Sequence, residues 1–324
     1  VIVKVAPGIY YENLQITKSI TLASHAIDDD LSNWINNIPY WHVENDNINN
    51  TIIDGSANPD STVYGSSILI YSDTEDCITP TIKGFTIQNG SSEEGGGLYV
   101  LNSDPTLKNL MIKNNASTWN GGGIFCNGAS PIIEDVTILS NSAVNVSGGI
   151  HFINGSNAKL SNVDIINNAA AADGGGINCY GSSPNIYKVT LVGNTSGNGG
   201  GIFCGDGSSP NVLNTVIADN YPQEIYFDES STGDSISISF SVVKNGQSGI
   251  TTNDNGTVMW GLGNIDIDPM FTDTASADYS LQRISHLIDH GHPDSTDLDG
   301  TRADIGAYYF DQSDLPGRIN PRTF

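Results

Sequence analysis

Aromatic residues and a histidine recur at one position of the chain with a nearly constant step. Tyr99, Phe125 and His151 follow one another at steps of 26, and Phe203 continues the series beyond Asn178 at steps of 27 and 25. Sugar rings stack on flat aromatic faces, so an exposed column of this kind can bind an extended glycan or a partner protein. The alternative is that a loop or a second protomer covers these side chains. We predict Tyr99, Phe125, His151 and Phe203 as ligand-binding residues.

A long segment without a repeat, residues 23–50, is the second candidate for ligand binding. It carries Trp34 and Trp41, and a loop longer than about 15 residues is usually functional or disordered. Two tryptophans argue against disorder. Trp34 and Trp41 are therefore predicted to contact a ligand, with a lid that packs over the start of the fold as the alternative.

Acidic residues near the end of the chain have the composition of a calcium-binding loop. Asp297-Leu298-Asp299-Gly300 is followed by Asp304, and carboxylate oxygens beside a glycine turn suit Ca²⁺. Asp297, Asp299 and Asp304 are thus candidate metal ligands, although Ser295 stands where an EF-hand needs its first aspartate. A structural role at the end of the fold is the alternative, and no cofactor is required.

No residue is assigned a catalytic role from the sequence. Glycoside hydrolysis needs two carboxyl groups about 5–9.5 Å apart, but Glu134 and Asp164 occupy different positions of neighbouring repeats. We expect them to be isolated acids on a solvated face. His151 has the ordinary pKa range of a general acid or base, yet no partner for it can be named.

An internal repeat determines the elements that must position these residues. Glycine-rich triplets begin at residues 95, 121, 147, 174 and 199. Apolar and polar residues alternate between the triplets, as in 133–138, and many are β-branched, which predicts strands separated by turns. A coil of about 26 residues made only of strands is one turn of a parallel β-solenoid.

Equivalent residues of successive coils are expected to lie on top of one another, about 4.8 Å apart. The apolar set forms an inward ladder: Leu107, Ile133, Leu160, Ile186 and Val212. A polar set forms an amide ladder at a turn, with left-handed backbone geometry: Asn115, Asn141, Asn168, Asn194 and Asn220. The glycine triplets mark positions of positive φ or close backbone approach.

Three of the four cysteines share one position of the repeat. Cys126, Cys179 and Cys204 are predicted to point inward as reduced, small apolar residues. A disulfide between Cys179 and Cys204, one coil apart, is the alternative. Zinc is disfavoured because no CxxC pair or histidine cluster accompanies them.

Segments near both ends are similar to known sequences. The opening Val-Lys-Val-Ala-Pro-Gly-Ile-Tyr-Tyr-Glu at 3–12, with segments 16–22 and 51–55, resembles the first coils of right-handed parallel β-helix proteins of the pectin-lyase-like superfamily. The Gly-Gly-Gly-Ile and Asn-Asn repeats resemble those of bacterial surface β-helices of the polymorphic outer-membrane protein type. Segments 268–271, 278–281, 285–291 and 297–308 resemble the closing segment of large secreted bacterial β-helix proteins.

The resemblance implies a right-handed helix and an extracellular or bacterial cell-surface location. It does not identify an activity, because that superfamily includes lyases, hydrolases, esterases, epimerases and adhesins. A family lyase acting on uronates would need Arg or Lys to neutralise the substrate. No arginine precedes Arg283, and the cations across the repeats are Lys108, Lys113, Lys159, Lys188 and Lys244. A net charge of −24 would also repel polyanions. Lyase activity on anionic glycans is therefore disfavoured.

We therefore predict an all-β chain built as a single-stranded right-handed parallel β-helix. The solenoid is expected over residues 1–260, interrupted by the insertion loop 23–50. Residues 261–324 are expected to form a short irregular C-terminal cap, the closing segment, and a linker-like tail.

Composition excludes two kinds of partner. With 12 Lys+Arg against 36 Asp+Glu, the net charge is −24, so no basic face is available for nucleic acid. No window of about 18 apolar residues predicts membrane insertion. The leading hypothesis is a secreted or cell-surface module that binds a polysaccharide or a surface protein without catalysis. The alternatives are a carbohydrate-active enzyme, a polysaccharide lyase or glycoside hydrolase with its site in the solenoid groove, and a structural subunit that self-associates through coil ends into fibres.

Overall fold

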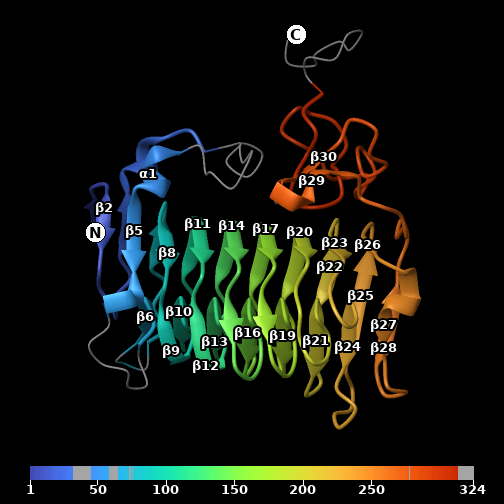
Figure 1. Ribbon diagram of the computed structural model, residues 1–324, viewed down its shortest axis with the longest axis horizontal. Helices are drawn as coiled ribbons and strands as arrows, with labels where there is room; N and C mark the ends of the chain where they lie inside the picture. Colours follow the sequence, from blue (N-terminus) through green and yellow to red (C-terminus); the bar gives the residue numbers. More distant parts are fainter. Residues whose placement is uncertain (32–44, 58–64, 73, 75, 277, 313–324) are drawn as a thin grey trace.

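The computed structural model describes residues 1–31, 45–57, 65–72, 74, 76–276 and 278–312. Strands of successive coils stack side by side along the long axis of the molecule, and the last part of the described chain lies against one flank (Figure 1). The stacked strands pair in parallel, whereas β29 (Phe271–Asp273) and β30 (Asp278–Leu281) form an antiparallel pair. The prediction of an all-β parallel β-solenoid is confirmed.

The largest sheet has 15 strands. Its main path runs in spatial order through β1 (Ile2–Val5), β4 (Thr21–Ser24), β7 (Thr81–Lys83), β11 (Thr106–Lys113), β14 (Ile132–Leu139), β17 (Lys159–Ile166), β20 (Asn185–Val192), β22 (Asn211–Leu213), β25 (Ser235–Ser239) and β28 (Thr257–Trp260). Its side branches are β2 (Gly8–Tyr10), β5 (Thr51–Asp54), β8 (Thr86–Gln88), β23 (Val216–Ala218) and β26 (Val242–Val243).

A nine-stranded sheet forms a second side of the solenoid. It consists of β3 (Leu14–Ile16), β6 (Ile68–Tyr71), β10 (Leu98–Leu101), β13 (Ile124–Asn127), β16 (Ile150–Ile153), β19 (Ile177–Tyr180), β21 (Ile202–Gly205), β24 (Ile225–Phe227) and β27 (Ile250–Thr251). A four-stranded sheet contains β9 (Ser91–Glu94), β12 (Ala116–Asn120), β15 (Ser142–Ala143) and β18 (Ala169–Ala170).

Helical structure is a minor part of the described residues. It comprises α1 (Asp46–Asn49) and the 3-10 turns η1 (His25–Asp28), η3 (Gly55–Ala57), η4 (Gly246–Gly249) and η5 (Thr274–Ser276). Within the described ranges, no helix has the length and apolar character needed to cross a membrane.

The predicted inward ladder forms the core of the solenoid. Strand register pairs Leu107 with Ile133, Ile133 with Leu160, and Leu160 with Ile186, and all these side chains are buried. Burying one such side chain contributes roughly 1.5–3 kcal/mol. Because each coil adds further rungs of the same kind, the repeat itself supplies the core.

The inward position of the cysteines is also confirmed. Cys126, Cys179 and Cys204 are buried in the solenoid core with free thiols. Cys179 and Cys204 are neighbours in the ladder but form no disulfide. They pack as small apolar side chains, as the repeat pattern indicated.

The predicted amide ladder exists, with one correction to its backbone. Asn115 donates its side-chain amide to Asn141, and Asn141 donates to Asn168, both at 3.0 Å. Left-handed geometry belongs instead to the residue before each rung, as at Asn114 (φ 55°) and Asn167 (φ 53°). The bend at that residue directs the following asparagine into the coil, where its amide reaches the next rung.

The glycine triplets serve both predicted purposes. The first glycine takes positive φ, as in Gly121 (64°) and Gly174 (66°), and Ser147 takes the same place at 58°. The second glycine allows close approach: a Cβ on Gly122 would lie 2.3 Å from the carbonyl oxygen of Ser142. A side chain at that position cannot fit between successive coils.

The C-terminal segment packs on the flank of the solenoid that is formed by outward-facing apolar side chains. The solenoid contributes Met111, Leu139, Ile166, Val192 and Val216. The C-terminal segment contributes Tyr279, Leu281, Leu287, Ile305 and Tyr308. This segment therefore covers several coils from the side.

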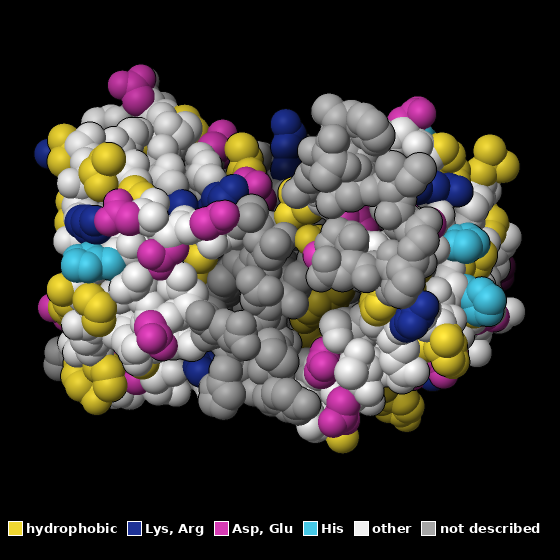
Figure 2. All heavy atoms as spheres, turned by 90° about the horizontal axis from the view of Figure 1, so that it is seen from above, with side chains coloured by type: hydrophobic (Ala, Val, Ile, Leu, Met, Phe, Trp, Pro, Cys, Tyr) yellow, Lys and Arg dark blue, Asp and Glu magenta, His cyan; other side chains and the backbone are white. Residues whose placement is uncertain are grey.

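Seen from the side that carries the C-terminal segment, acidic side chains are spread over the surface (Figure 2).

Candidate functional site

The predicted aromatic column lies on the outward side of the nine-stranded sheet, but it is not exposed. Tyr99 pairs in register with Phe125, and Phe125 with His151. The exposed fractions of Tyr99, Phe125, His151 and Phe203 are 6, 2, 4 and 5%. The expectation of an open aromatic stripe is therefore wrong, because each side chain in so tight a stack covers the next.

The column has two parts, which are in contact because Phe125 packs edge to face on His151, with ring centroids 5.2 Å apart. Tyr99 and Phe125 pack edge to face, with ring centroids 5.1 Å apart, and form a closed apolar cluster with Leu69. His151 and Phe203 instead line a pocket of about 490 Å³. A ligand-binding role for these residues stays a prediction, and the geometry favours the second part of the column.

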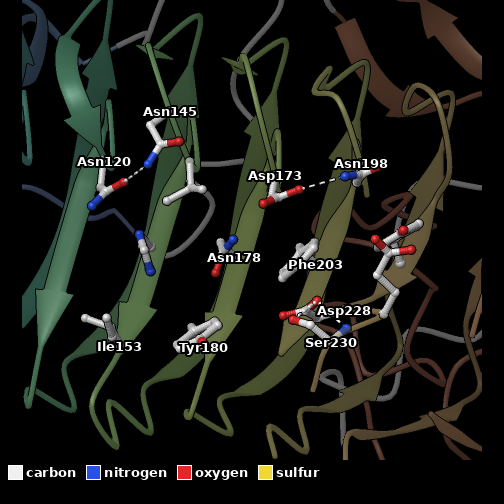
Figure 3. Close-up of a pocket in the computed structure, with 14 residues that line it drawn as sticks. Asn120, Asn145, Ile153, Asp173, Asn178, Tyr180, Asn198, Phe203, Asp228 and Ser230 are labelled. Carbon is white, nitrogen blue, oxygen red and sulfur yellow. Dashed lines mark hydrogen bonds between the residues drawn. The ribbon is translucent and has the colours of Figure 1, made fainter. Parts of the chain in front are cut away.

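The pocket has a floor and two walls, which Figure 3 shows as three rows of labelled side chains. One wall carries Asn120, Asn145, Asp173 and Asn198. Asn178 and Phe203 occupy the middle row, from the neighbouring strands β19 and β21. The other wall carries Ile153, Tyr180, Asp228 and Ser230. Val146, His151, Tyr226 and Glu229 complete the lining.

Amide and carboxylate groups are fixed along the first wall. Asn198 donates to Asp173 Oδ1 at 2.9 Å, and the side-chain amides of Asn145 and Asn120 are hydrogen-bonded at 3.3 Å. Backbone bridges join Asp173 to Asn198 and Asn120 to Val146. Asn120, Val146, Asp173 and Asn198 stand directly before the glycine triplets and Asn145 one residue earlier, so the solenoid repeat holds them in one row.

Acidic groups lie on both walls. Burial raises the pKa of the Asp173 carboxyl, the hydrogen bond from Asn198 opposes this, and the charge of Asp228 raises the pKa further. Asp228 Oδ1 accepts hydrogen bonds from the backbone N–H and the hydroxyl of Ser230, both at 2.9 Å. Neither lysine nor arginine is among the described residues that line the pocket.

Two polar side chains on the floor lack hydrogen-bond partners among the described residues. These are His151, at both ring nitrogens, and Asn178, at Oδ1. They are adjacent rungs of β16 and β19, and only 4% and 2% of their surfaces are exposed. Burial lowers the pKa of His151 to about 3, so this side chain is neutral at physiological pH. His151 therefore brings no positive charge to the pocket.

The predicted calcium ligands are engaged by the protein itself. Asp297 accepts hydrogen bonds from the Lys188 side chain and from the backbone N–H of Asp304. Asp299 accepts from the backbone N–H groups of Thr301 and Gln312. Asp304 accepts from the backbone N–H groups of Asp289 and Phe310. No three His, Cys, Asp or Glu side chains in the described part of the chain converge on a point that could hold a metal ion. This geometry favours the structural role, and calcium binding stays a prediction.

The other sequence-predicted residues lie away from the pocket or outside the description. Trp34 and Trp41 lie outside the described residues. Glu134 accepts a hydrogen bond from Lys108 at 2.7 Å on the large sheet. Asp164 was expected on a solvated face, but it is fully buried and accepts a hydrogen bond from Tyr308 at 2.8 Å. The C-terminal segment excludes water from Asp164, and no local sequence pattern predicted this contact.

Several pocket residues escaped the sequence analysis. Asp173 could have been found, because the residue before each glycine triplet is polar in most repeats: Glu94, Asn120, Asp173 and Asn198. Tyr226 could not, because its coil has Gln223-Glu224 in place of glycines and only the strand pairing places it after Phe203.

Comparison with known proteins agrees with this architecture. Residues 43–264 match the model of a family described as a right-handed β-helix region. Among curated proteins no sequence match was found. Among solved structures, a pectin methylesterase from Yersinia enterocolitica is similar with a TM-score of 0.37 and 13% identity, over 83% of this chain and 87% of that one. The pectate lyase Pel9A gives a TM-score of 0.48 and 12% identity, over 95% of this chain and 87% of that one.

Proposed function

Because this chain belongs to the right-handed β-helix family and its outward face carries a pocket of aromatic, amide and acidic side chains, we propose that it binds a glycan in that pocket. The observation that carries the proposal is the combination of Phe203 and Tyr226 with four asparagines in one cavity. Aromatic faces pack against the C–H faces of sugars, and amides both donate to and accept from hydroxyl groups.

The charge of the pocket restricts the class of glycan. Asp173, Asp228 and Glu229 are the charged side chains of the described lining, and the whole chain has a net charge of −24. A uronate-containing polymer would meet like charge both at a distance and in contact. The proposal therefore concerns sugars without carboxylates.

Glycoside hydrolysis is a second candidate function, favoured by one specific observation. Asp173 and Asp228 stand on opposite walls, with Phe203 between them in Figure 3. The raised pKa of Asp173 suits a general acid, and Asp228 is held as an acceptor by Ser230. Glycosidases generally use two carboxyl groups in different environments, one as the general acid and one as the base or nucleophile.

A panel of soluble glycans, measured for retention and for new reducing ends, tests both functions. Phe203→Leu is the pocket variant, and Phe271→Leu is its matched control, because Phe271 is a half-buried phenylalanine of the C-terminal segment and does not line the pocket. Retention that falls in Phe203→Leu and persists in Phe271→Leu supports binding. Retention that falls equally in both folded variants contradicts the proposed site. Reducing ends that disappear in Asp173→Asn and Asp228→Asn would establish hydrolysis.

An extracellular or cell-surface location accompanies this proposal. It is supported by the acidic composition with few cations. Protease treatment of intact cells tests it: the chain should be degraded from outside while a cytoplasmic marker protein survives. Persistence of the chain until the cells are lysed would contradict the location.

Association through the coil ends is supported by the first coil. Apolar side chains are exposed there, including Ile2 at 64% and Ile9 at 53%, and among the described residues β1 pairs with β4 alone. An unpaired strand edge with apolar side chains favours pairing with another chain. Sedimentation at increasing concentration should show higher species that Ile2→Lys reduces, and a monomer at every concentration would contradict this contact.

A further inference from the structure

Uncompensated negative charge is the first feature of the pocket that points to a particular ligand. Asp173 and Asp228 are half-buried and Glu229 is exposed. Asp173 and Asp228 face each other from opposite walls of the pocket, and like charges placed in this way repel, in the same direction as the raised pKa of Asp173. A bound cation would relieve this repulsion.

The aromatic side chains of the same pocket form a second feature. The rings of Phe203 and Tyr226 are stacked, with centroids 5.8 Å apart and an angle of 18° between their planes. Tyr180, on the neighbouring wall, is 40% exposed. An ammonium group is attracted to the face of an aromatic ring, and carboxylates beside such rings strengthen that attraction.

Unpartnered polar atoms on the floor are a third and independent feature. Asn178 Oδ1 and both ring nitrogens of His151 have no hydrogen bond among the described residues, although both side chains are more than nine-tenths buried. Buried polar atoms nearly always have hydrogen-bond partners, so unpartnered atoms that line a pocket are places where a ligand can form hydrogen bonds. Asn178 Oδ1 can only accept a hydrogen bond, which an N–H or O–H group of a ligand would supply.

We propose that the pocket binds a sugar carrying a primary ammonium group, of the 2-amino-2-deoxyhexose class, with the ammonium between Asp173 and the Phe203–Tyr226 pair. This inference rests on the proposed glycan-binding function and specifies its ligand. A polyamine also carries ammonium groups, but it has no hydroxyls for the amides of Asn120, Asn145 and Asn198. The amides therefore favour a sugar.

Calorimetric titration with matched oligosaccharides tests the proposal. The ligands are β-1,4-linked glucosamine oligomers, the same oligomers after N-acetylation, and glucose oligomers of equal length, at mildly acidic pH where the sugar amine is protonated. Acetylation removes the charge and leaves the ring and the remaining hydroxyls. Because the ammonium contact is partly desolvated, the glucosamine oligomer should bind roughly tenfold more tightly than the other two, a difference of about 1.4 kcal/mol.

Variants separate the charge from the shape of the pocket. Asp173→Asn keeps an oxygen that can accept from Asn198, so it should cut the affinity for glucosamine oligomers about tenfold and leave the acetylated oligomers unchanged. Glu93→Gln removes an exposed carboxylate on β9 and should change neither. Should Asp173→Asn not fold, the salt dependence of wild-type binding still decides: the preference for the amine must shrink as salt rises.

The outcomes distinguish the proposed amino-sugar specificity from the proposed glycan-binding function. Equal affinity for the amine and acetylated oligomers would overturn the inference while the glycan pocket stands. Failure of every oligomer to bind would remove both. Spermidine that binds as tightly as the glucosamine oligomer would show that the pocket recognises ammonium without the sugar, which also overturns the inference.

Discussion

Asn220 donates its side-chain amide to the carboxylate of Glu224 at 2.7 Å, and this bond ends the asparagine ladder. Each ladder amide donates to the oxygen of the next asparagine, as Asn194 does to Asn220 at 2.9 Å. The last amide has no further asparagine and requires an acceptor from elsewhere. Glu224, 4% exposed, supplies it.

Removing that acceptor should destabilise the last coils. Glu224→Leu removes the side-chain acceptor of the Asn220 amide, leaves it only the carbonyl oxygens of Leu191 and Ala218, and should lower the free energy of unfolding by about 1–3 kcal/mol. Glu224→Gln keeps an acceptor oxygen and should cost less than about 1 kcal/mol. Urea unfolding measures both. Equal loss in the two variants would show that the ladder does not depend on this acceptor.

Stability should fall as pH rises because a buried acid lies under the C-terminal segment. Burial raises the pKa of Asp164 from its usual 3.8 to about 7, although the hydrogen bond from Tyr308 opposes this. The folded state therefore holds a proton that the unfolded chain releases. This contribution to stability is complete below pH 3.8 and is lost as pH rises through 7. Glu224 and Asp304, whose pKa values burial also raises to about 7, act in the same direction.

Thermal unfolding at about pH 5 and about pH 8 measures this effect. The wild type should unfold at a lower temperature at the higher pH, and Asp164→Asn, which cannot ionise, should reduce the difference. Asp76→Asn, at an exposed position, is the control and should leave the difference unchanged. A wild type that is more stable at the higher pH would contradict the assignment.

A methyl group at the second glycine of a triplet should separate two coils. The Cβ of Gly122→Ala would lie 2.3 Å from the Ser142 carbonyl oxygen. This oxygen belongs to the backbone of the next coil, so it cannot move away as a flexible side chain would. We expect a loss of about 1–3 kcal/mol or failure to fold. Gly8→Ala, where the nearest atom is 3.5 Å away, should stay within about 0.5 kcal/mol. The soluble yields and urea midpoints of the two variants test this prediction. Equal values for Gly122→Ala and Gly8→Ala would contradict it.

Thiol labelling should distinguish one cysteine from the other three. Cys77 is exposed, whereas Cys126, Cys179 and Cys204 are buried, where desolvation raises their pKa values well above the ordinary range. A thiol reagent at mildly alkaline pH should modify Cys77 alone in the native protein and all four in denaturant. Rapid native labelling of a second cysteine would place that thiol outside the core.

The repeat by itself determined the solenoid. Steps of 25–27 residues and a two-residue alternation are local features, and they are sufficient because parallel stacking places each residue on its own equivalent. The inward positions of Leu107, Ile133 and the buried cysteines, and the bonding of the asparagine ladder, followed from this rule. The alternation also placed Phe125 correctly on the outward side of its strand.

Tertiary structure alone decided what covers the outward positions. The alternation predicts Asp164 on a solvated face, but Tyr308, 144 residues later, covers it and donates a hydrogen bond to it. No period in the sequence relates two such distant residues. The pocket is likewise assembled across coils: His151, Asn178, Phe203 and Tyr226 become one floor through strand register, and Asp228 joins them from a coil without the glycine triplet. Period and alternation specify which side of a strand a residue faces, whereas exposure depends on which distant segment packs there.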